Sequence, residues 1–116
     1  MIIGAVVVAI LSIAIIVLVP LCATGRIPRN PFVGLRLPAF FASEEAWEAG
    51  HRAAVPSSVC GAIVAVVACV LAIALPSIAG VWFTVAVVAL LAGLAVGAVL
   101  GTRAAQRAPR PSDVGR

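Results

Sequence analysis

The residues of this chain that could do chemistry are few and lie close together in sequence. His51 is the only histidine, Glu48 lies three residues before it, and Ser43, Ser57 and Ser58 are near. A nucleophile needs a base and an orienting group that converge on it. One helical turn bearing Glu, His and Arg is more typical of an interfacial polar face, so we expect no enzyme activity, no catalytic residue and no cofactor.

The cysteines do not form a metal-binding or disulfide pattern. Cys22, Cys60 and Cys69 are odd in number, and all three lie in apolar stretches. A zinc site or a disulfide scaffold would need clustered cysteines with polar neighbours. We therefore expect three small buried apolar side chains and no bound metal.

The composition excludes a soluble globular domain. Apolar residues make up 64% of the 116 residues and charged residues only 10%, whereas a soluble domain is about half apolar and about a quarter charged. A chain this short cannot bury its excess of apolar residues in a core, so we expect the lipid bilayer to be the partner that covers them. All eight basic residues are arginines. Because they flank apolar stretches, they favour anionic headgroups, and we expect no direct contact with nucleic acid.

Two long stretches without charge predict three membrane spans. Residues 2–23 form a helix long enough to cross a hydrocarbon core of about 30 Å. They lack the basic start and the cleavage pattern of a signal peptide. Residues 53–102 are too long for one span and right for two, with a turn at Pro76-Ser77 and Gly80. We predict an all-α integral membrane domain over 1–102, with transmembrane helices at 2–23, 55–75 and 80–102.

The loop that joins the first two spans, residues 24–54, contains most of the polar groups. Three prolines within residues 28–38 exclude a continuous helix. Apolar residues alternate over 33–38, which favours a short extended segment. Ser43 followed by two glutamates predicts a helix start. We expect a short interfacial helix at about 44–53, separate from the second span.

The arginines predict the orientation. Four lie in the loop and four in the tail, and none lies at the N-terminus or in the 76–80 turn. The positive-inside rule therefore puts loop and tail in the cytoplasm and the N-terminus outside the plasma membrane. The tail, residues 103–116, has no apolar periodicity, and we expect it to be a disordered basic segment.

The third span has glycine at every fourth position: Gly93, Gly97 and Gly101. Such a row lets helix backbones approach closely in lipid. Two interpretations remain open, which are packing inside the three-helix bundle and contact with an outside membrane protein or a second copy of the chain. No span carries an ionisable side chain other than cysteine, which argues against a proton-coupled transporter.

Two features of the loop suggest how it folds. Trp47 and His51 are four residues apart and share a helix face, either as an anchor at the headgroups or as a docking surface. Arg36 lies among apolar residues, where an unpaired guanidinium is costly. We predict a bidentate contact between Arg36 and Glu45 that folds the extended segment onto the helix. Carbonyls of the Asn30-Pro31 turn are the alternative acceptors.

The loop sequence resembles the SdpI family of small bacterial membrane proteins. The matching stretches are N-P-F-V-G-L-R-L-P, then S-E-E-A-W, then H-R. The family signature falls on eight residues: Asn30, Gly34, Arg36, Pro38, Glu45, Trp47, His51 and Arg52. Leu37 stands where a threonine is common. The founding member, which has additional N-terminal helices, confers immunity to a secreted peptide toxin and sequesters a transcriptional repressor at the membrane.

Two functions follow as expectations. The first, implied by the resemblance, is immunity to a membrane-active peptide toxin or signalling of its presence, with a soluble regulator on the cytoplasmic side. The alternative is an accessory or scaffold subunit of a larger membrane complex that docks through the glycine-rich third helix.

Overall fold

The computed structural model describes residues 2–108, and every regular element in that range is helical. The long helices are α1 (Ile2–Ala23), α2 (Glu44–Ala74) and α3 (Ala79–Arg107). Two short 3₁₀ helices, η1 (Pro38–Ala42) and η2 (Pro76–Ile78), precede α2 and α3. All three long helices are long and apolar enough to cross a membrane. The predicted all-helical architecture with three apolar spans is therefore confirmed for the described residues.

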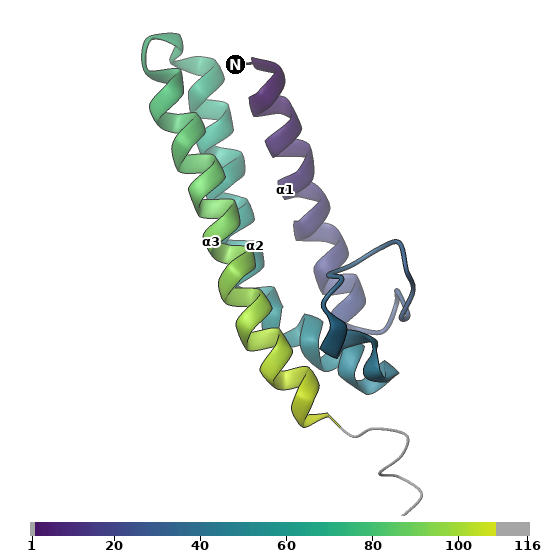
Figure 1. The fold of residues 1–116 in the computed structure, drawn as a ribbon. Coiled ribbons are helices and arrows are strands. Elements are labelled where there is room, and N and C mark those ends of the chain that lie inside the picture. Colours follow the sequence, from purple (N-terminus) through teal and green to yellow (C-terminus); the bar gives the residue numbers. More distant parts are fainter. Residues whose placement is uncertain (1, 109–116) are drawn as a thin grey trace, which may run out of the picture.

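The spans form a hairpin with one added helix. α2 and α3 run antiparallel and are joined by η2, and α1 packs along α2 while hardly touching α3 (Figure 1). The interior between the helices consists mainly of small side chains, whereas many of the large aliphatic ones are exposed on the outside. Lipid gives little hydrophobic drive for helix association, so close packing of small residues has to supply it. The exposed valines, leucines and isoleucines form the surface that lipid would cover.

The backbones of α2 and α3 approach closely at Gly61 of α2 and Gly93 of α3. A Cβ atom on Gly93 would stand 2.6 Å from the backbone oxygen of Ser57 and 3.0 Å from the Cα of Gly61. A Cβ atom on Gly61 would stand 2.6 Å from the backbone oxygen of Ala89. The two backbones therefore touch at a point where only hydrogen fits.

The prediction of a separate short helix at 44–53 is wrong. Residues 44–53 are the first turns of α2, which continues to Ala74 with Pro56 inside it. Proline removes one helical hydrogen bond and crowds the preceding turn, which bends a helix without necessarily ending it. Figure 1 shows this bend, with the first turns of α2 at an angle to the rest of the helix.

The end of α3 and the presence of η1 also differ from the sequence prediction. α3 continues to Arg107, five residues beyond the predicted end at 102, because Arg103, Ala104 and Ala105 favour a helix. The first part of the predicted disordered tail is thus helical, and residues 109–116 lie outside the described residues. The η1 helix was not predicted. Leu37 before it is extended, in line with the alternating pattern, and Pro38 starts the 3₁₀ turn.

Candidate functional site

The loop between α1 and α2 folds into a compact structure that Asn30 organises at its tip. The Asn30 Oδ1 accepts hydrogen bonds from the amides of Phe32 at 2.9 Å and Val33 at 2.7 Å. Its Nδ2 donates to the carbonyl of Pro28 at 2.7 Å. One side chain therefore closes the turn, as asparagine commonly does.

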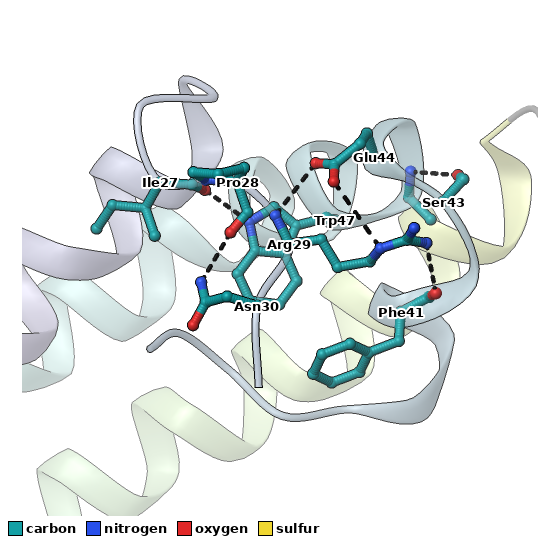
Figure 2. A network of polar contacts seen from close by, with 9 residues as sticks. Ile27, Pro28, Arg29, Asn30, Phe41, Ser43, Glu44 and Trp47 are labelled. Carbon is teal, nitrogen blue, oxygen red and sulfur yellow. Dashed lines mark hydrogen bonds and ion pairs between the residues drawn. The ribbon is translucent and has the colours of Figure 1, made fainter. Parts of the chain in front are cut away.

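A second set of polar contacts ties the loop to the start of α2 (Figure 2). The backbone amide of Arg29 donates to Glu44 Oε2 at 3.1 Å, and the Arg29 Nε lies 3.8 Å from Glu44 Oε1. The Arg29 Nη1 donates to the carbonyl of Phe41 at 2.8 Å. The Ser43 Oγ accepts from the amide of Ala46 at 3.0 Å and caps α2.

The ion pair predicted between Arg36 and Glu45 is absent from the described residues. Both side chains are exposed, and the ion pair that joins loop to helix is made by Arg29 and Glu44. The physical reason is backbone direction. Gly34 has a left-handed φ of +106°, and the next residue, Leu35, donates its amide to His51 Nε2. The chain just before Arg36 is thus held at His51, six residues or about 9 Å along α2 from Glu45.

Trp47 is the centre of the loop's core. Its side chain is fully buried, and its indole Nε1 donates to the carbonyl of Ile27 at 2.9 Å. Gly34 lies against the indole, because a Cβ there would stand 2.9 Å from two ring carbons and 3.0 Å from the Cys22 Sγ. Of the two interpretations of the Trp47 and His51 face, neither the headgroup anchor nor the docking surface fits, since the loop covers both side chains.

His51 connects α2 to the loop through both ring nitrogens. The Nδ1 lies 2.7 Å from the carbonyl of Trp47, and the Nε2 lies 2.9 Å from the amide nitrogen of Leu35. A carbonyl can only accept and an amide N–H can only donate, so the geometry selects the neutral ring with its proton on Nδ1. The ring is fully buried beside Trp47, with centroids 4.4 Å apart. Neither nitrogen is free for a substrate or a metal in this arrangement.

Phe40 is a functional part of this core that sequence reasoning missed. It is fully buried, and its ring meets that of His51 edge-on, with centroids 4.9 Å apart. A Cβ on either Gly50 or Gly101 would stand 2.6 Å from this ring. Phe40 therefore wedges η1 between α2 and α3. The two glycines facing each other on neighbouring helices were the only signal that could have indicated it.

The eight signature residues divide into two groups. Asn30, Gly34, Trp47 and His51 hold the loop together through the contacts above, and Pro38 begins η1. Arg36, Glu45 and Arg52 are exposed, and none of their side chains makes an ion pair or hydrogen bond with any residue in the range 2–108. The loop and the first turns of α2 therefore present three charged side chains that the described fold does not use.

The glycine row of α3 packs inside the chain. Gly93, Gly97 and Gly101 are buried, and the atoms nearest to them belong to α2 and to Phe40. This arrangement leaves no free glycine face for an outside helix or a second copy of the chain. Residues 2–108 also contain no group of three or more histidine, cysteine or acidic side chains that could hold a metal ion.

Substitutions at His51 separate its hydrogen bond from its ring packing. We expect His51→Leu to lower the free energy of unfolding by about 1–3 kcal/mol, because the part-buried amide of Leu35 would lose its acceptor. His51→Gln should cost clearly less, since the glutamine oxygen can replace Nε2 as acceptor. Thermal unfolding of the purified protein in detergent measures both. Equal losses would show that packing against Trp47 and Phe40, and not the hydrogen bond, is what matters.

Comparison with known proteins gives one match. The model of the SdpI/YfhL protein family matches residues 26–101, which covers the loop, α2 and most of α3. No curated protein and no solved structure matches the chain significantly. Because the family match includes more than half of the chain and all eight signature residues, the chain belongs to the SdpI/YfhL protein family.

Proposed function

We propose that this chain is a multi-pass protein of the bacterial plasma membrane that gives immunity to a membrane-active peptide toxin or signals its presence. The single observation that carries the proposal is that Arg36 of the loop and Glu45 and Arg52 of α2 are exposed, while the other signature residues are occupied in folding. A loop held this firmly is well suited to present charges to a partner, because little ordering is needed on binding. The proposal assigns the chain no enzyme activity and no cofactor.

The partner class follows from the side of the membrane on which the loop lies. Arginines occur in the loop and after α3, and none occurs at the start of α1 or around η2. The positive-inside rule therefore favours a cytoplasmic loop and an outer N-terminus. On that side the charged group would face a soluble regulator or the cytoplasmic part of a membrane protein. The toxin itself would reach the spans from outside.

Cysteine labelling tests this orientation. Ser77 in η2 and Gln106 near the end of α3 are both exposed. In intact cells, a membrane-impermeant maleimide should label Ser77→Cys and leave Gln106→Cys unlabelled until the membrane is opened. The reverse pattern would place the loop outside and would remove the soluble regulator from the proposal.

A deletion strain tests the function. Cells without the gene should become more sensitive to at least one peptide in a broad panel of membrane-active peptides, and the parent gene on a plasmid should restore resistance. Growth inhibition at graded peptide concentrations is the measurement. Unchanged sensitivity across the whole panel would contradict the immunity proposal.

A further inference from the structure

The tip of the loop carries the most exposed large apolar side chain of the described range. Phe32 is 88% exposed, more than any aliphatic residue on the spans. Its neighbour Pro31 is also exposed. An aromatic side chain held outside the protein core is costly in water unless another apolar surface covers it.

The tip lies beside the apolar part of α1 and not beyond its end. Figure 1 shows the segment between α1 and η1 turning back along the last turns of α1. A shallow apolar groove joins the two, lined by Leu11, Ala14, Ile15, Leu18 and Val19 of α1 with Gly34 and Leu35 of the loop. Leu11 precedes the end of α1 by about three turns. Gly34 itself lies beside Cys22, in the last turn of α1, so the groove runs from the end of the span toward its apolar part.

The backbone of the tip meets only part of the condition for a lipid environment. In hydrocarbon, each amide N–H and each carbonyl needs a partner within the protein. Pro31 has no amide N–H. The amides of Phe32 and Val33 donate to the Asn30 side chain, and the amide of Leu35 donates to the His51 ring. The amide of Gly34 and the carbonyls of 31–35 have no partner among the described residues. The tip therefore suits the membrane interface, where water and headgroups reach its backbone, and not the hydrocarbon core.

Charged side chains flank the tip on both sides. Arg29 is engaged with Glu44 and the carbonyl of Phe41. Arg36 is exposed and has no partner in the described range. A long arginine side chain next to an apolar segment can keep its stem in the lipid and reach the phosphates.

We propose that residues 31–35 lie in the interface of the bilayer leaflet next to the loop, with the Phe32 ring among the acyl chains beside α1 and Arg36 at the phosphate level. The loop is then an interfacial wedge that fixes the depth of α1, and Arg36 at the phosphate level stays accessible to the same partner as Glu45 and Arg52. The occupant of the groove beside Gly34 and Leu35 is lipid acyl chain. This inference does not depend on the proposed immunity function.

Spin labels placed at single cysteines test the insertion. The full chain, with its three native cysteines replaced by alanine, is labelled at Phe32→Cys and reconstituted into vesicles of phosphatidylethanolamine and phosphatidylglycerol. Val17→Cys, on the exposed side of α1, is the lipid reference, and Gln106→Cys is the aqueous reference. Position 32 should match Val17, with high accessibility to oxygen and low accessibility to a nickel chelate. A match to Gln106 would overturn the proposal and leave Phe32 free for a protein partner.

A second measurement keeps the native cysteines. The Phe32→Trp variant adds one indole to Trp47 and Trp82. Its additional fluorescence should be quenched by lipids brominated on the upper acyl chain, and little by acrylamide in water. Strong acrylamide quenching without quenching by brominated lipid would overturn the insertion even if the cysteine-free protein failed to fold.

Discussion

Replacing Gly93 with alanine should lower the free energy of unfolding by about 1–3 kcal/mol, the usual cost of forcing an extra carbon into a packed site. The added Cβ would meet the Ser57 backbone oxygen at 2.6 Å and the Cα of Gly61 at 3.0 Å. Neither is the end of a flexible side chain, so α2 and α3 would have to separate. Because close contact is what holds helices together in lipid, the loss should also reduce protein abundance in the membrane.

Two glycines on the same helix serve as controls for Gly93. A Cβ on Gly80 would meet nothing within 4 Å, so Gly80→Ala should change stability by less than about 0.5 kcal/mol. A Cβ on Gly97 would meet the Ser58 Oγ at 2.5 Å, an atom that rotation of the serine side chain can move away. The stability loss of Gly97→Ala should therefore lie between those of Gly80→Ala and Gly93→Ala. Thermal unfolding in detergent gives the order. A Gly93→Ala protein as stable as Gly80→Ala would show that the helices are not in contact at Gly61.

Gly34→Ala should disrupt the loop while leaving the spans assembled. The φ of +106° is unfavourable for any L side chain, at about 1–2 kcal/mol. The Cβ would in addition stand 2.9 Å from the indole of Trp47, which its hydrogen bond to Ile27 holds in place. We expect a red shift of tryptophan emission as Trp47 meets water. Faster tryptic cleavage at Arg36 should accompany it.

Gly25→Ala is the matched control, because Gly25 also has a positive φ, of +79°. Its added carbon would meet the carboxylate of Glu48, which is half-exposed and can swing away. Gly25→Ala should therefore carry the backbone cost alone and keep the emission of buried Trp47. If both variants behaved alike, the contact between Gly34 and Trp47 would not be what fixes the loop.

The spans were predictable because lipid imposes a strong rule on composition. Uncharged stretches of the right length can cross the bilayer only as helices, and α1 has the predicted bounds 2–23. The same rule did not predict that the helix at 44–53 continues into the second span. Whether Pro56 ends a helix or only bends it depends on the packing around it.

The sequence predicted which residues of the loop matter, but not which of them contact one another. The signature contains Trp47 and His51, yet periodicity alone could place them only on one common face. What covers that face is decided by the turn at Asn30 and the left-handed Gly34, which bring Leu35 onto His51 and leave Arg36 outside. The alternation of residues 33–38 carries no information on these dihedral angles, so Arg36 was chosen as the partner of a glutamate when Arg29 has that role.

Complementation of the deletion strain tests the central claim that the exposed signature charges of the loop and of the start of α2 carry the function. The triple variant Arg36→Ala, Glu45→Ala, Arg52→Ala removes them without touching the contacts of Asn30, Gly34, Trp47 or His51. The control variant Arg26→Ala, Arg103→Ala removes two exposed arginines outside the signature. At equal protein abundance, the control should restore resistance to the peptide as the parent does, and the triple variant should fail. Full resistance from the triple variant would contradict the claim and assign the function to the spans.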